Sequence, residues 1–464
     1  QMCIRDRSNA SLLDEATAAA EAMTLAKRSA KSKSELFFVD ENSFENTINI
    51  LKTRAEPLGI KLLIGDPSDI VNYEIFGAYL QYPGSNGKIA DLSHCIESCH
   101  KQSALAVVGT DLLALTILKP PGEMGADIVI GSSQRFGVPL GCGGPHAAFM
   151  AVSDKLKRSM PGRIVGASVD SNGDIAYRLA LQTREQHIRR EKATSNICTA
   201  QALLAIMAGF YSIYHGKEGL IEIADKVHRL TCILKNNLVT HGFNCVEDEF
   251  FDTLVVETKG NTKEIHERSI NKNVNLRIIN NEFIGISLDE TSSEADIKAI
   301  TDVFINKQIE LDIDYESSIP QNLRRTSSFL DHDVFKCYRT ETELLRYIRK
   351  LSDKDIALDR AMIPLGSCTM KLNATSEMIP VSWPEFSNIH PFAPKDQLKG
   401  YEELINDMER MLSDLTGYSK ISLQPNAGSQ GEYAGLLAIN AFHKKNNESH
   451  RNICLIPKSA HGTN

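Results

Sequence analysis

The segment Gly428-Ser429-Gln430-Gly431 has the clearest chemical potential in the chain. Its glycines allow the backbone to approach a ligand closely, and its serine and glutamine add a hydroxyl and an amide. The apolar residues that follow predict a helix. The segment would then lie at a helix N-terminus, where free N–H groups and the helix dipole attract anions. We therefore expect Gly428, Ser429 and Gln430 to form a phosphate-binding turn.

A related pattern lies near the start of the chain. Asn9-Ala10 and Glu15 correspond to Asn426-Ala427 and Glu432 at a constant separation of 417 positions. We expect each copy to form a tight turn that leads into a helix. Because the first copy has Ser11-Leu12-Leu13-Asp14 in place of the glycines, the sequence indicates a duplicated phosphate-binding module with one degenerate copy.

Composition excludes several other classes of protein. The chain has 464 residues, of which 42% are apolar and 24% charged, as in a soluble globular protein of about three domains. A net charge of −8 argues against nucleic acid or an anionic membrane as a partner. The ten scattered cysteines suggest free thiols in a reducing compartment. The longest apolar stretch, 197–214, has polar flanks and predicts a buried helix rather than a membrane span.

Short apolar strands alternate with helices in the first part of the chain, which predicts a mostly parallel sheet covered by helices on both faces. We expect helices at 44–55 and 89–99, and strands at 36–39, 61–64, 104–108, 127–130 and 147–152.

The pattern changes from about Thr194 to that of a smaller α+β domain. We expect a long helix capped by Thr194 or Ser195 and a second helix at 220–238. Strands follow at 253–257, 274–279 and 283–288, with a helix opened by the capping pair Ser293 and Asp296.

These elements divide the chain into four parts. We expect a degenerate sheet domain at 8–190, a small domain at 191–311, a linker at 312–340 and the start of a cofactor-binding module at 341–464. A helix at 341–351 would open this second module, and a strand at 453–456 would lie near its end. The first seven residues fit no pattern, and the chain stops just past that strand, so we expect a fragment of a longer protein.

Long motifs resemble the P-protein of the glycine cleavage system, at 12–23, 131–139, 184–196, 363–373, 424–432 and 459–464. The resemblance implies an α/β enzyme of the aspartate-aminotransferase-like fold (PLP fold type I), with two homologous modules and pyridoxal 5'-phosphate as cofactor. It implies a glycine dehydrogenase (aminomethyl-transferring) that decarboxylates glycine and passes the aminomethyl group to the lipoyl arm of the H-protein.

Roles for particular residues follow from the resemblance. Gly428, Ser429 and Gln430 would hold the cofactor phosphate, with His461 stacked over the pyridine ring and Thr463 beside it. The loop Ser367-Cys368-Thr369 and Asn373 would reach toward the substrate. The alternatives are a simple strand-end cap at His461 and a buried structural turn at the loop.

In the first module, Asp111 follows a strand where the acidic partner of the pyridinium would lie. Arg135 stands where the second half of the family has its cofactor lysine, and a guanidinium that stays protonated cannot form a Schiff base. The separation of 417 puts the aldimine lysine at roughly position 552, beyond Asn464. Lys371 precedes the phosphate turn and is rejected, so we expect no catalytic lysine and no activity in this chain alone.

Other possibilities are a metal site, other classes of function and different partners. His94, Cys95, Cys99 and His100 lack a second ligand pair, so we expect no metal. Two other function classes remain: a non-catalytic partner subunit that completes another chain's active site, and a different PLP fold type I decarboxylase. We also expect a homodimer that binds glycine and the lipoylated H-protein, without nucleic acid or membrane. It would be cytoplasmic in a bacterium, or mitochondrial in a eukaryote.

Overall fold

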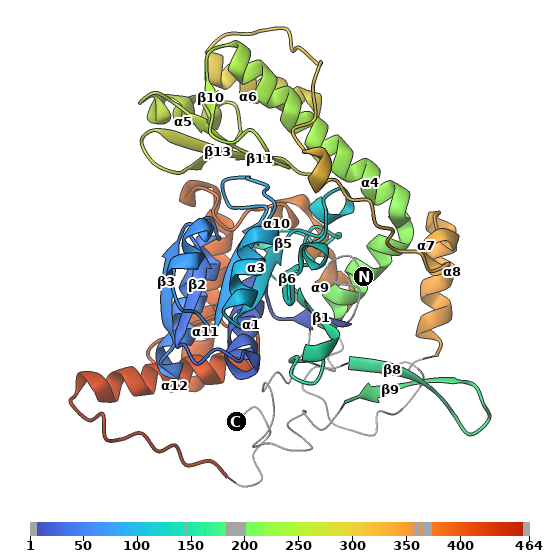
Figure 1. Ribbon diagram of the computed structural model, residues 1–464, viewed down its shortest axis with the longest axis vertical. Coiled ribbons are helices and arrows are strands. Elements are labelled where there is room, and N and C mark those ends of the chain that lie inside the picture. Colours follow the sequence, from blue (N-terminus) through green and yellow to red (C-terminus); the bar gives the residue numbers. More distant parts are fainter. Residues whose placement is uncertain are drawn as a thin grey trace.

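The computed structural model describes residues 7–144, 146–162, 164–181, 201–354, 357, 360, 362 and 374–457. Figure 1 shows a blue-to-teal sheet domain below a yellow-green small domain, with the long helix α4 running between them. The red helix α12 lies beside the blue helix α1, although the two are far apart in sequence.

A seven-stranded sheet forms the centre of the first domain. Its β7 is antiparallel to both neighbours, β1 and β6, and the remaining pairs are parallel. In spatial order the strands are β1 (Arg7–Leu12), β7 (Ala148–Val152), β6 (Ile128–Ser132), β5 (Leu105–Thr110), β4 (Gly77–Tyr82), β2 (Leu36–Asp40) and β3 (Lys61–Gly65).

Both faces of this sheet are buried, because successive strand residues point to opposite sides and each side meets helices. Phe37 and Tyr79 pack on the face that carries Met23 of α1 and Leu51 of α2. Phe38 and its neighbours pack on the other face, which continues into the core of the small domain. The covering helices are α1 (Glu15–Ser29), α2 (Glu45–Ala55) and α3 (Ser93–Lys101). The predicted mostly parallel α/β architecture is confirmed.

The small domain is a four-stranded antiparallel sheet with helices packed beside it. Ser293 and Asp296 form the predicted capping box at the start of α6. The strands are β10 (Asn244–Cys245), β11 (Thr253–Glu257), β12 (Arg277–Ile278) and β13 (Phe283–Ser287), and the helices are α4 (Ala202–Thr240), α5 (Thr262–Asn271) and α6 (Glu294–Ile305). A separate hairpin joins β8 (Ile164–Val169) and β9 (Ile175–Ala180).

The rest of the described chain consists of helices joined by irregular segments. Residues 312–333 are mainly irregular. The helices that follow are α7 (Val334–Cys337), α8 (Glu341–Ser352), α9 (Thr375–Met378), α10 (Pro384–Ser387), α11 (Lys399–Thr416) and α12 (Gly428–Lys445).

Two sequence-based expectations are wrong. Asn9 and Ala10 lie inside strand β1 rather than in a turn, because the Asn9 amide bonds the Met150 N–H and the Pro161 carbonyl. The expected strand at 453–456 is irregular and exposed, without a described neighbour to pair with. The two long helices are confirmed, because α4 consists of two helices that meet at a kink at Gly216, whose φ and ψ are non-helical. The proposed caps Thr194 and Ser195 lie outside the described residues.

Candidate functional site

The carboxyl ends of two parallel strands bring Asp111 and Arg135 together. Asp111 directly follows β5, and Arg135 lies in the turn after β6, two neighbouring strands of the sheet. Open sheets of this kind collect their functional groups at this edge. One Asp111 oxygen accepts the Ala114 N–H at 2.8 Å, which fixes the carboxylate at the end of its strand.

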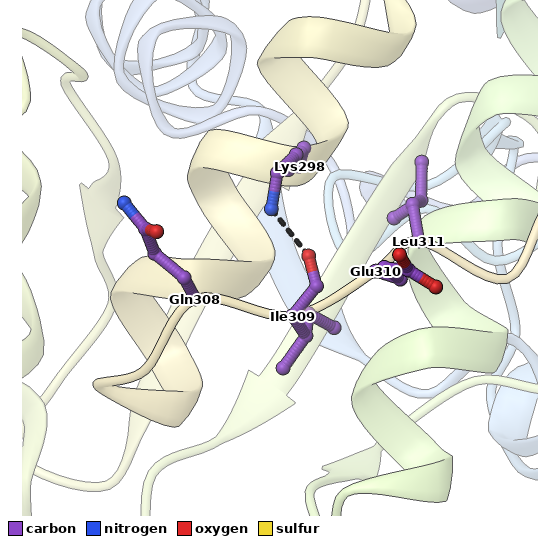
Figure 2. A pocket seen from close by; sticks show the side chains of 5 residues that line it. All are labelled: Lys298, Gln308, Ile309, Glu310 and Leu311. Carbon is purple, nitrogen blue, oxygen red and sulfur yellow. Dashed lines mark hydrogen bonds between the residues drawn. The ribbon is translucent and has the colours of Figure 1, made fainter.

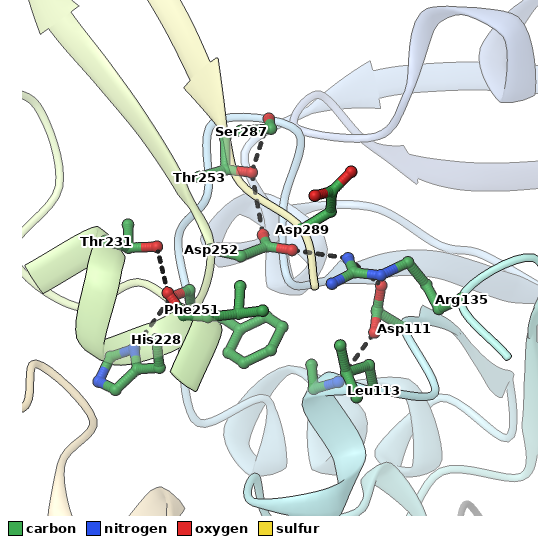
Figure 3. A network of polar contacts seen from close by, with 12 residues as sticks. Asp111, Leu113, Arg135, His228, Thr231, Phe251, Asp252, Thr253, Ser287 and Asp289 are labelled. Atoms are coloured by element: carbon green, nitrogen blue, oxygen red, sulfur yellow. Dashed lines mark hydrogen bonds and ion pairs between the residues drawn. The ribbon is translucent and has the colours of Figure 1, made fainter. Parts of the chain in front are cut away.

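Arg135 closes this site with two ion pairs (Figure 3). Its Nη1 lies 3.0 Å from Asp111 Oδ2 and 2.7 Å from Asp252 Oδ2. Asp252 comes from the small domain, where its other oxygen accepts the Thr253 hydroxyl at 3.0 Å. The arginine therefore links the large and small domains across the edge of the sheet.

Burial and ion pairing shift the pKa values of Arg135 and Asp252 in this cluster. Burial alone would lower the pKa of Arg135, but Asp111 and Asp252 raise it well above its ordinary value. Burial raises the pKa of the Asp252 carboxyl, while the Arg135 charge opposes that rise. Because Asp111 is already paired with Arg135, it is not free to hold a pyridinium nitrogen. The first module therefore does not fit the expected cofactor.

Glu15 adds a carboxyl group beside the same site. It opens α1, and its Oε2 accepts the Ser132 N–H at 3.2 Å at the end of β6. Burial raises the pKa of Glu15 to about 8, and the nearby Asp111 charge adds to the effect. The other oxygen, Oε1, is buried without a hydrogen-bond partner among the described residues. Glu15 is thus protonated over most of the neutral range.

The expected phosphate turn does open a helix. Gly428, Ser429 and Gln430 are the first three residues of α12, and the turn before them is extended at Ala427. A side chain at Gly428 would meet nothing within 4 Å. The Gln430 side chain folds back, and its Oε1 accepts the Asn426 N–H at 3.0 Å. These contacts leave the Ser429 hydroxyl and the first N–H groups of α12 as candidate anion donors.

The remaining predicted site residues lie outside the described residues. These are His461 and Thr463 of the cofactor set and Ser367, Cys368, Thr369 and Asn373 of the substrate loop.

Two residues of this charged cluster were missed by the sequence reasoning. Asp252 gave no signal, because only the tertiary fold brings it to Arg135. Glu15 did have a signal, since it and Glu432 stand at the repeat separation of 417.

Other polar features of the described residues do not compete with this site. The hollow in Figure 2 lies in the small domain, where Lys298 donates to the Ile309 carbonyl and to Asp302. His100 pairs with the buried Asp127 at 2.8 Å, and Cys99 is buried in the core. No group of three or more candidate metal ligands occurs in the described part of the chain. Within that same part, none of the helices has the length and apolar character needed to cross a membrane.

Comparison with known proteins gives consistent matches. A family model described as glycine cleavage system P-protein matches residues 3–304. The glycine dehydrogenase (decarboxylating) of Stenotrophomonas maltophilia strain K279a is 59% identical over 459 residues, covering 98% of this chain and 48% of that protein. The Bradyrhizobium diazoefficiens protein of the same description is 58% identical over 462 residues, covering 99% of this chain and again 48% of the relative. The chain therefore spans about half the length of the curated relatives it matches.

A solved structure gives the same answer for the fold. A crystal structure of glycine decarboxylase (P-protein) of the glycine cleavage system, in inhibitor-bound form, superposes with a TM-score of 0.60 at 30% identity. The match covers 65% of this chain and 71% of the other. The expected aspartate-aminotransferase-like fold class is confirmed.

Proposed function

Because the chain belongs to the glycine cleavage system P-protein family, we propose that it is part of a glycine dehydrogenase (decarboxylating) that uses pyridoxal 5'-phosphate. When bound, this cofactor supplies the electron sink for the loss of the glycine carboxyl group. The family match favours this reading over a different decarboxylase of the same fold.

One observation carries the assignment of roles to the two modules. In the first module Arg135, which the family resemblance aligns with the cofactor lysine, pairs with Asp111 and Asp252 at the edge of the sheet. The first module then serves as a scaffold for the second.

The cofactor would be held by the start of α12. The Ser429 hydroxyl and the N–H groups of Gly428 and Ser429 lie at the positive end of an 18-residue helix, which suits a phosphate dianion. We assign His461 and Thr463 to the cofactor ring and Ser367, Cys368, Thr369 and Asn373 to the substrate loop. The support for these six is the P-protein motifs in which they stand.

The same proposal covers domains and partners. We keep the limits 8–190, 191–311, 312–340 and 341–464, with glycine as substrate and the lipoylated H-protein as acceptor of the aminomethyl group. We further propose a homodimer in the bacterial cytoplasm. The bacterial relatives and the scattered cysteines support that location.

The test is cofactor affinity in the full-length protein. Ser429→Ala removes one charge-assisted hydrogen bond to the phosphate, so it should weaken pyridoxal phosphate binding by about 1–3 kcal/mol in an absorbance titration. Ser422→Ala is the matched control, because its hydroxyl serves only the nearby Gln424 N–H. One cofactor should bind per full-length chain. Unchanged affinity in Ser429→Ala, or two cofactors per chain, would contradict the proposal.

A further inference from the structure

The two copies of the repeat touch each other through a closed ring of hydrogen bonds. Asn426 Nδ2 donates to Asp14 Oδ2 at 2.8 Å, and Gln430 Nε2 donates to Thr17 Oγ1 at 3.1 Å. The Thr17 hydroxyl donates to the same Asp14 oxygen at 2.9 Å. Gln430 Oε1 accepts the Asn426 N–H at 3.0 Å, which completes the ring. Asp14 and Thr17 belong to the first module, whereas Asn426 precedes the phosphate turn of the second module and Gln430 is the last residue of that turn.

The ring fixes both sides of the turn. Thr17 is buried in the first domain, and Asp14 is held there because its Oδ1 accepts the Thr17 N–H at 2.7 Å as the N-cap of α1. Asn426 precedes Ser429 by three positions and Gln430 follows it directly. A displacement of either amide would therefore change the direction of the Ser429 hydroxyl and of the first N–H groups of α12.

The ring also indicates what the Gln430 side-chain amide does. Both of its polar atoms are engaged, the nitrogen by Thr17 and the oxygen by the Asn426 N–H. The side chain therefore acts as a brace between the modules, and phosphate binding falls to Ser429 and the backbone.

A second contact holds the next turn of α12. The Arg54 guanidinium lies 5.3 Å from the centre of the Tyr433 ring, a cation–π distance. Arg54 Nη2 lies 3.1 Å from Oε1 of Glu21, and this ion pair orients the guanidinium. The Glu21 side chain is only 8% exposed. Because Arg54 comes from α2, this contact joins α12 to a second helix of the first module.

We propose that Asp14 and Thr17 of the degenerate module are positioning residues for the cofactor-phosphate turn of the other module. The first module thus keeps a role in the chemistry after losing its own site: it holds the turn of its partner module in the phosphate-binding shape. This inference rests on the proposed cofactor role of Ser429.

The experiment compares four variants in the full-length protein by titration with pyridoxal phosphate. Thr17→Val keeps the shape of the side chain but removes the hydroxyl, and should raise the cofactor Kd about 3- to 10-fold. Thr17→Ser keeps the hydroxyl and should restore binding. Asp14→Asn should also weaken binding, because its new N–H₂ group would face the Asn426 N–H₂ group. Adding Asn426→Asp should partly restore it by reversing that hydrogen bond.

These outcomes separate positioning from mere helix stability. Asparagine caps a helix about as well as aspartate, so a purely structural Asp14 would tolerate Asp14→Asn without any change in Kd. Thr24→Val is the matched control, since the Thr24 hydroxyl bonds only the Glu21 carbonyl of its own helix. Unchanged Kd in Thr17→Val, or a loss that neither Thr17→Ser nor the paired exchange restores, would overturn the inference. Failure of Ser429→Ala alone would instead overturn the proposed function.

Discussion

Removing the Arg135 charge should destabilise the first module strongly. Arg135→Met preserves much of the side-chain volume but leaves the Asp111 and Asp252 carboxylates facing each other. The side chains of these three residues are only 17%, 23% and 13% exposed, so solvent screens the loss poorly. Breaking a buried pair in this way costs about 3–5 kcal/mol. For a domain of this size, we expect a fall of at least roughly 6 °C in melting temperature.

The loss should depend on pH with a definite sign. Burial already raises the pKa of Asp252 in the folded protein, and removing Arg135 raises it further. The folded variant then binds a proton more tightly than the unfolded chain, so its stability falls as pH rises through the raised folded pKa. The difference between Arg135→Met and the unmodified protein should therefore be smaller at pH 5 than at pH 8.

Thermal unfolding of the 464-residue chain at the two pH values is the assay, with limited proteolysis to follow release of the small domain. Arg229→Met is the matched control, because its pair with Glu294 is 35% and 53% exposed and should be worth at most about 1 kcal/mol. In a double-mutant cycle, Asp252→Asn should recover part of the loss caused by Arg135→Met. A loss equal to that of the control, or one that does not vary with pH, would show that Arg135 does not hold two buried carboxylates in place.

Two further predictions concern other positions. Burial raises the pKa of Glu15 to about 8 against 4.5 for the free group, so the native state loses stability as pH rises from 5 to 8. The stability of Glu15→Gln relative to the unmodified protein should therefore rise from pH 5 to pH 8. Melting temperatures measured at several pH values test this. A difference in melting temperature that stays constant with pH would count against a buried, protonated carboxyl at Glu15. Gly216 breaks α4 with φ 57° and ψ −169°, a conformation nearly restricted to glycine, so Gly216→Ala should cost about 1–3 kcal/mol. An added Cβ would also meet the Arg339 guanidinium, and full rescue by Arg339→Ala would show that this contact, not the backbone, is the cause.

Local patterns were enough to identify many of the elements. Leu36–Asp40 and Lys61–Gly65 are strands where short apolar runs predicted them. The Ser293 and Asp296 capping box forms because both partners lie within one turn of the same helix. The parallel sheet followed from the alternation of strands and helices, and the family resemblance followed from long motifs. Such features depend on residues close in sequence.

Features that join distant segments were decided only by the tertiary structure. The repeat pattern predicts a turn at Asn9, yet Asn9 is a strand residue because β7, far along the chain, supplies its partner. Asp252 reaches Arg135 only because the small domain packs on the edge of the sheet. Asp14 and Gln430 belong to one polar ring although 416 positions separate them. No local sequence pattern predicts these contacts, because each one depends on how separate elements pack together and not on the conformation of a single element.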